Sequence, residues 1–157
     1  MQTQAVTITS ALADSVRAYP GCRAHFRLVA DQTNNSLAVI DLVKTPGSEP
    51  PRHVHLNEDE TVFLKQGEMT FFIGDDIVTA ATGDVIFMPR NVPHHFAITS
   101  TEAIMTLVVT PGGFDKFFEA ITIPYEGESA PPIEGAPSEE ELTALFTAAE
   151  RFGINFL

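Results

Sequence analysis

The sequence predicts an all-β domain, built as a sandwich or barrel of short strands. Six β-rich segments follow one another between residues 61 and 110, and turn-forming residues separate them. No long helical pattern interrupts this series, which excludes a parallel sheet of alternating strands and helices. Several segments carry large apolar side chains on both faces, as expected where one face lines a barrel and the other packs against a second sheet or a partner subunit. A homodimer is therefore expected.

The strands are expected in a regular order along the chain. Residues 25–43 hold two β-rich runs around the turn-forming sequence DQTNNS, which predicts a hairpin. The six segments that follow are TVFLK (61–65), MTFFI (69–73), IVTAA (77–81), DVIFM (84–88), HHFAIT (94–99) and AIMTLVVT (103–110).

Two helices are expected after the last strand of this series. A short helix folded over the barrel is predicted from four apolar residues at helical spacing, Phe114, Phe117, Phe118 and Ile121. The barrel with its N-terminal strands is assigned to residues 1–125, and an acidic connector with a C-terminal helix to residues 126–157. Ser138 and Glu141 form a capping box that begins this helix. Its apolar stripe is expected to pack on the barrel or on a partner subunit and consists of Leu142, Leu145, Phe146, Ala149 and Phe152.

Composition excludes several classes of partner. Nine Lys and Arg against 21 Asp and Glu give a net charge of −12, which repels phosphate backbones and anionic membrane surfaces. We therefore expect no nucleic acid and no membrane as partners. The N-terminus lacks the pattern of a signal peptide and Cys22 has no second cysteine to pair with, so a cytoplasmic location is expected.

Two histidines, His53 and His55, stand one residue apart in a segment that looks like a strand. Alternate residues of a strand share a face, so the two imidazoles can meet at one metal ion. Two ligands do not complete a transition-metal site, and taken alone such a pair is more often an ordinary surface or core feature. Among the carboxylates that follow, Glu60 is the predicted ligand because it begins the inward face of the next strand, while Glu58 is the reserve.

The second source of imidazole is RNVPHHF, residues 90–96. Pro89 and Pro93 fix φ and stiffen this loop, so the next strand is entered in a set direction. Only one of the adjacent His94 and His95 can face inward, and the residues alone leave that choice open.

The spacing of these residues resembles the two motifs of the cupin superfamily. The first motif is matched at every position by Gly47, His53, His55, Glu60 and Gly67. The second is matched by Gly83, Pro89 and His94, with Asn91 where the family usually has Gly and Ile98 where it often has Asn. Asn tolerates positive φ better than most residues, so the first departure is mild.

The resemblance implies a double-stranded β-helix, the cupin jelly-roll barrel, over roughly residues 25–121. It also implies that His53, His55, Glu60 and His94 bind one divalent transition-metal ion, which would be iron, nickel, manganese, copper or zinc. His95 is then left outside the ligand set.

Within the superfamily, the segments HVHLNEDETVFLKQGEMTFFIGDD, GDVIFMPRNVPHHF and TPGGFDKFF resemble single-domain quercetin 2,3-dioxygenase-like small cupins. This resemblance implies dioxygen-dependent cleavage of a small, flavonol-like or enolisable aromatic substrate, with Glu60 as the catalytic residue that takes its proton. Two alternatives use the same scaffold. One is a non-oxidative metalloenzyme, an isomerase or polyketide cyclase, and the other is a cupin that binds a small molecule without turnover.

An apolar pocket is expected inside the barrel, although most of its residues also suit simple core packing. The candidates are Val62, Leu64, Met69, Phe71, Ile73, Ile86, Met88 and Phe96. Arg52 and Arg90 flank the ligand segments, where they would receive an anionic substrate or, as the favoured alternative, act as ordinary exposed arginines.

Overall fold

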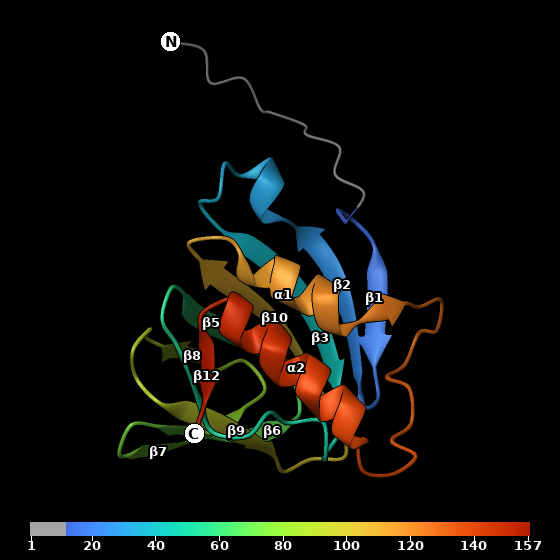
Figure 1. Ribbon diagram of the computed structural model, residues 1–157. Helices are drawn as coiled ribbons and strands as arrows, with labels where there is room; N and C mark the ends of the chain where they lie inside the picture. Colours follow the sequence, from blue (N-terminus) through green and yellow to red (C-terminus); the bar gives the residue numbers. More distant parts are fainter. Residues whose placement is uncertain (1–11) are drawn as a thin grey trace.

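The computed structural model describes residues 12–157, which form two antiparallel sheets facing each other in a jelly roll (Figure 1). The predicted all-β double-stranded β-helix is therefore confirmed. The seven-stranded sheet has the order β11 (Ile123–Pro124), β1 (Val16–Tyr19), β2 (Cys22–Leu28), β3 (Ala38–Lys44), β10 (Ala103–Thr110), β5 (Asp59–Gln66) and β8 (Val85–Met88). The five-stranded sheet has the order β12 (Ile154–Phe156), β4 (His53–His55), β9 (His94–Ile98), β6 (Glu68–Ile73) and β7 (Asp76–Ala81).

The strands predicted from the sequence are present, with additions at both ends of the chain. The six segments between residues 61 and 110 are β5 to β10, and the predicted hairpin is β2 paired with β3. A 3-10 turn, Ala30–Gln32, lies within the connection of that hairpin. The strands β1, β11 and β12 were not predicted. Of these, β12 matters most for function because it pairs with β4, the strand that carries two histidines.

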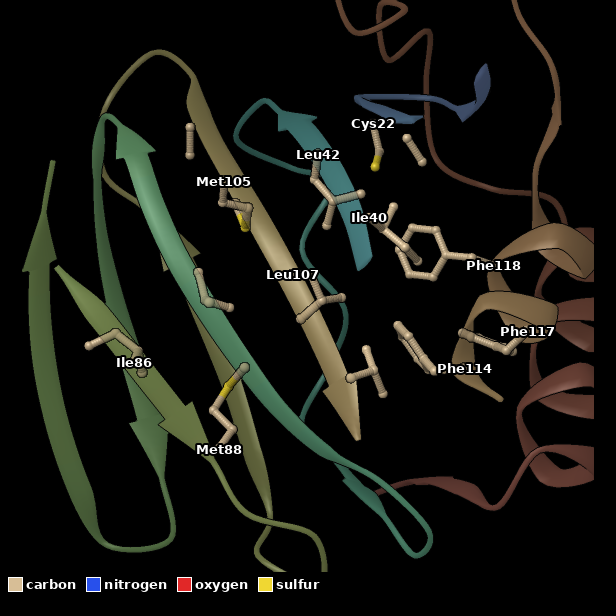
Figure 2. Close-up of a cluster of buried hydrophobic side chains, with 14 of the residues drawn as sticks. Cys22, Ile40, Leu42, Ile86, Met88, Met105, Leu107, Phe114, Phe117 and Phe118 are labelled. Atoms are coloured by element: carbon tan, nitrogen blue, oxygen red, sulfur yellow. The ribbon is translucent and has the colours of Figure 1, made fainter. Parts of the chain in front are cut away.

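The hydrophobic core lies between the two sheets and beneath the first helix (Figure 2). In β10 every second residue is buried, which is the pattern of a strand with one face on the core. Met105 and Leu107 on this strand are 2% and 4% exposed, and Figure 2 shows them between the inward side chains of the neighbouring strands.

Helix α1 (Phe114–Ile121) covers one end of the core, as predicted. Its three phenylalanines, Phe114, Phe117 and Phe118, are buried. Asp115 is also buried, and its carboxylate accepts hydrogen bonds from the backbone N–H groups of Ala30 and Gly113, both at 3.0 Å. These two bonds satisfy a buried charge and fix the start of the helix against the turn after β2.

Helix α2 (Glu139–Arg151) begins with the predicted capping box. The Ser138 N–H donates to the Glu141 carboxylate at 2.7 Å, and the Glu141 N–H donates to the Ser138 hydroxyl at 3.2 Å. The helix lies shallowly, since only Ala149 of its predicted stripe is buried and Phe146 remains 46% exposed. Its end is attached to α1 through the rings of Phe117 and Phe152, whose centroids are 6.1 Å apart.

An apolar patch on the outer face of β5 and β8 consists of Phe63, Val85 and Phe87, which are 42%, 53% and 55% exposed. Phe63 pairs with Val85 across the two strands, so the three side chains share one face. The expected homodimer remains a prediction, and this patch is the surface we would assign to it.

No helix of residues 12–157 is both long enough and apolar enough to cross a membrane.

Candidate metal centre

The candidate ligands come from both sheets and meet between them. His53 and His55 alternate on β4, so both imidazoles point into the barrel. His94 begins β9 directly opposite His53 in the antiparallel pairing. Glu60 comes from β5 of the other sheet, where it shares the inward face with Val62 and Leu64.

These four residues form a compact cluster of buried donor atoms. One donor from each of His53, His55, Glu60 and His94 lies within 4.8 Å of every other, and all four side chains are buried. The Glu60 Oε2 atom lies 3.1 Å from His94 Nε2 and 3.5 Å from His55 Nε2. Three imidazoles and one carboxylate suit a divalent transition metal, so the cluster can hold one such ion.

Backbone carbonyls set the orientation of two imidazoles. The Nδ1–H of His53 donates to the Pro51 carbonyl at 2.8 Å, and the Nδ1–H of His94 donates to the Val92 carbonyl at 2.9 Å. A carbonyl only accepts, so the proton of each neutral ring resides on Nδ1 and the Nε2 lone pair is left for an ion. Both rings are therefore in the tautomer that a metal site requires.

The electrostatics of the cluster favour a neutral His53 beside an ionised Glu60. Burial lowers the pKa of His53 to about 4. Burial alone would raise the pKa of Glu60. The neighbouring His55 and His94 outweigh burial and lower this pKa to about 2. Burial also disfavours the charged form of His55, yet Glu60 and Glu58 together raise its pKa above the ordinary value. Near neutral pH, Glu60 is thus an anionic donor facing His53 in its neutral form.

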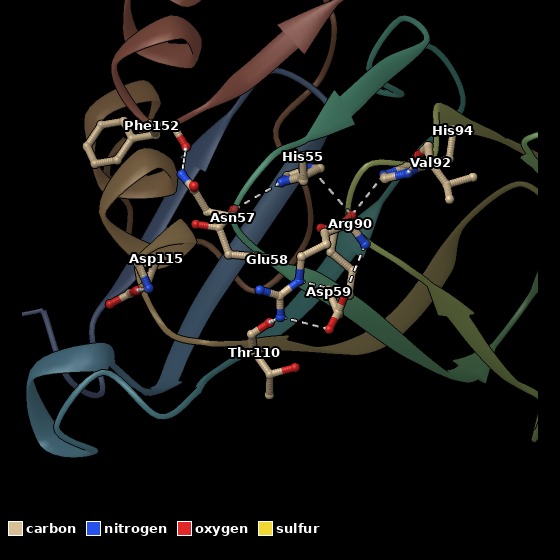
Figure 3. A network of polar contacts seen from close by, with 12 residues as sticks. His55, Asn57, Glu58, Asp59, Arg90, Val92, His94, Thr110, Asp115 and Phe152 are labelled. Atoms are coloured by element: carbon tan, nitrogen blue, oxygen red, sulfur yellow. Dashed lines mark hydrogen bonds and ion pairs between the residues drawn. The ribbon is translucent and has the colours of Figure 1, made fainter.

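The turn between β4 and β5 is anchored to the loop before β9 (Figure 3). Arg90 Nε and Nη2 donate to the two oxygens of Asp59 at 3.1 and 2.9 Å, and the Arg90 N–H adds a third bond at 2.8 Å. These hydrogen bonds lower the pKa of Asp59. Asn91, which stands where the second motif usually has Gly, has a positive φ of 62°. Its N–H donates to the His55 carbonyl at 2.8 Å.

The two flanking arginines thus have structural partners. Arg90 holds Asp59, and Arg52 donates to the Gly74 carbonyl at 2.9 Å. Both are half-buried, so neither is the ordinary exposed arginine that the sequence favoured, and a role in receiving an anionic substrate stays a prediction.

His95 and Glu58 lie outside the cluster in different ways. His95 points to the other side of β9 and stacks on Phe72, with ring centroids 4.4 Å apart and planes 3° from parallel. Glu58, the reserve ligand, is buried beside His55 but is not one of the four converging residues.

Two aromatic side chains lie against the imidazoles, and the sequence did not predict either contact. The Phe114 ring meets His55 edge-on at 5.0 Å, and the Phe156 ring lies 5.8 Å from His53. Phe156 also lines a groove of about 520 Å³ together with Phe146, Glu150, Ile154, Asn155 and Leu157. Of the eight residues proposed to line an interior pocket, six are buried in the core, and Ile73 and Phe96 are partly buried.

The comparisons with known proteins agree with this geometry. Residues 43–110 match the cupin domain family. The quercetin 2,3-dioxygenase of Bacillus subtilis (strain 168) is 32% identical over 108 residues, which cover 67% of this chain and 32% of that protein. The quercetin 2,3-dioxygenase of Aspergillus japonicus is 32% identical over 71 residues, which cover 42% of this chain and 20% of that protein. The chain therefore spans only about a third or less of these relatives.

Solved structures share the fold. A predicted oxalate decarboxylase from Thermotoga maritima superposes with a TM-score of 0.57 at 18% identity, covering 67% of this chain and 99% of that one. The S161A mutant of the Bacillus subtilis oxalate decarboxylase OxdC gives 0.56 at 24% identity, covering 64% of this chain and 28% of that one. At these identities the likeness describes architecture alone.

Proposed function

The chain is a cupin similar in sequence to quercetin 2,3-dioxygenases, and we propose that it is a metal-dependent dioxygenase acting on a small, flavonol-like or otherwise enolisable aromatic substrate. One observation carries the proposal: four buried donors from two sheets converge within 4.8 Å. Such convergence is costly unless an ion compensates it, because buried polar groups lose their hydration. The names of the sequence relatives support the choice of substrate class and of dioxygen as co-substrate.

In this proposal His53, His55 and His94 would hold the ion through Nε2, and Glu60 would hold it through its carboxylate. Iron, nickel, manganese, copper and zinc all accept this donor set. The ion supplies Lewis acidity that makes a bound hydroxyl easier to deprotonate.

Glu60 is the proposed proton acceptor. In the metal-free protein, despite burial, the neighbouring His55 and His94 lower the pKa of Glu60 to about 2, so its carboxylate is ionised at neutral pH but is a weak base. It can therefore take a proton only from a hydroxyl that has already been acidified, such as the enolic hydroxyl of a flavonol.

The surroundings suit a flat, apolar substrate. Phe114 and Phe156 lie against His55 and His53, so the imidazoles have apolar neighbours. Apolar surroundings of this kind favour an aromatic ligand over a charged one.

Oxygen uptake by protein loaded with each candidate metal, assayed with a panel of flavonols and β-diketones, tests the proposal. We expect uptake that depends on both metal and substrate. Product formed equally well without oxygen would refute dioxygenase activity and would support an isomerase or cyclase instead. Tight binding without product under either condition would refute turnover altogether.

Three variants test the residue roles. His94→Ala should lose the metal, whereas His95→Ala, one residue along on the opposite face of β9, should keep it. Glu60→Gln should lower turnover by at least about 100-fold, the usual size of a general-base contribution. Full turnover in a Glu60→Gln protein that retains its metal would reject Glu60 as the base.

A further inference from the structure

Two buried polar atoms beside the candidate metal centre have no hydrogen-bond partner within residues 12–157. They are the Nδ1 atom of His55 and the Oε2 atom of Glu58. The side chains are 1% and 6% exposed, so neither atom faces bulk solvent. Leaving either group unpaired inside a protein destabilises the fold.

The two unpaired atoms face each other. His55 Nδ1 lies 3.6 Å from Glu58 Oε2, a contact drawn as a dashed line in Figure 3. This separation exceeds a normal hydrogen bond by less than about 1 Å. A small approach would satisfy both groups, because a neutral imidazole with its proton on Nδ1 donates and a carboxylate accepts.

From this geometry we propose that Glu58 is a positioning residue for the metal. Its carboxylate accepts a hydrogen bond from His55 Nδ1–H and so holds the His55 Nε2 lone pair toward the ion. The inference rests on the proposed metal centre, since it assigns a role within that same site.

The positions of the two carboxylates around His55 separate their roles. Glu60 Oε2 lies 3.5 Å from His55 Nε2, whereas Glu58 Oε2 lies 3.6 Å from Nδ1 on the other side of the ring. An ion held by Nε2 is therefore out of reach of the Glu58 oxygen that faces Nδ1. This arrangement explains why Glu58 is buried next to a ligand without belonging to the ligand cluster.

Among the three imidazoles, His55 alone would have a carboxylate as the partner of its Nδ1–H. His53 and His94 donate from Nδ1 to neutral backbone carbonyls, while His55 has an anionic partner. Hydrogen bonds to a carboxylate are stronger than those to a carbonyl, and they make the opposite ring nitrogen a better donor to a metal. Glu58 thus sets both the tautomer and the ligand strength of His55.

Charge balance supports the same assignment. Within the described residues, no Lys or Arg lies within ion-pair distance of Glu58; Arg90, whose pKa is raised by Asp59 and to a lesser extent by Glu58, pairs with Asp59 instead. Glu58 and Glu60 together carry two negative charges, which one divalent cation among three neutral imidazoles would balance. The binding of a divalent ion therefore compensates the buried charge of Glu58 as well as that of Glu60.

The test compares Glu58→Gln, Glu58→Ala and a control, Glu68→Gln, in which the same substitution falls on an exposed residue. Metal affinity is measured with Co²⁺ and Ni²⁺ by competition against a chelator at fixed pH. We expect Glu58→Ala to bind about 10–100-fold more weakly, the usual effect of losing such a partner. Glu58→Gln should fall between Glu58→Ala and the wild type, because its amide oxygen remains a neutral acceptor. Glu68→Gln should match the wild type.

Two further readouts separate positioning from a merely structural role. Thermal unfolding of the metal-free proteins should leave Glu58→Gln close to the wild type, because its amide oxygen still accepts from His55 Nδ1–H. The visible absorption spectrum of the Co²⁺-loaded protein should shift in both Glu58 variants and not in the control, because the donor strength of His55 changes. Affinities within about two-fold of wild type in both variants would overturn the inference. A wild type that binds no metal would instead overturn the metal centre itself.

Discussion

Acidification should destabilise the metal-free protein at a pH where ordinary carboxylates are still ionised. Histidine in an unfolded chain has a pKa near 6.5, whereas burial lowers the pKa of His53 to about 4 in the folded protein. Between these two values the unfolded chain takes up a proton that the folded protein does not. Stability is therefore full above pH 6.5 and falls as the pH drops toward 4.

The size of this effect follows from the two pKa values. At about 1.4 kcal/mol per pH unit, the interval from 6.5 to about 4 corresponds to about 3 kcal/mol. For a domain of this length that is a fall in melting temperature of roughly 10 °C. His55 has the opposite sign, because its raised pKa makes the folded protein bind a proton more tightly than the unfolded chain. Its contribution is lost as the pH rises through that raised value, so metal-free stability should be greatest near pH 6.5.

The assay is thermal unfolding of chelator-treated protein at intervals between pH 4 and 8. Burial also lowers the pKa of His95, so His95 contributes to the same dependence of melting temperature on pH. The contribution of His53 is therefore isolated with His53→Gln. This variant should show a flatter profile between pH 4 and 6.5, whatever its absolute stability. A wild-type melting temperature that stays constant over that interval, or an equal slope in His53→Gln, would refute the reasoning.

Two stability predictions come with matched controls. Gly67 and Gly83 both have φ near +100°, but a Cβ at Gly67 would lie 2.4 Å from the Glu102 carbonyl oxygen while one at Gly83 meets nothing within 4 Å. Gly67→Ala should therefore cost about 1–3 kcal/mol more than Gly83→Ala in urea unfolding, and equal costs would show that the clash is relieved. Ser138→Ala should cost about 1 kcal/mol through loss of the cap of α2, measured beside Ser129→Ala in the exposed connector; no difference between them would mean that the end of α2 frays freely.

Much of the site could be predicted because strand periodicity is local. Glu60, Val62 and Leu64 follow one another at intervals of two residues, and all three are buried as that period requires. The choice between His94 and His95 could not be made from the period alone, which says only that the two face opposite ways. Pairing of His53 with His94 across β4 and β9 decides it, and that register arises between segments about 40 residues apart.

The features that the sequence analysis missed depend on contacts distant along the chain. Strand β12 is three residues long, too short to show a period, and exists because Ile154 and Phe156 pair with His55 and His53 about 100 residues earlier. Glu58 belongs to an acidic run that looks like a solvated loop. It is buried by packing that includes Gly113, at the start of α1, where a Cβ would lie 3.5 Å from its Oε1 atom.

The central claim is that one divalent ion is held by three imidazoles and Glu60. Its most direct test is elemental analysis of untagged protein purified without chelator, combined with an anomalous difference map recorded at the absorption edge of the metal found. We predict close to one equivalent of metal and a single peak among His53, His55, Glu60 and His94. Stoichiometric metal with its peak elsewhere, or four side chains that stay empty after incubation with each candidate ion, would contradict the account.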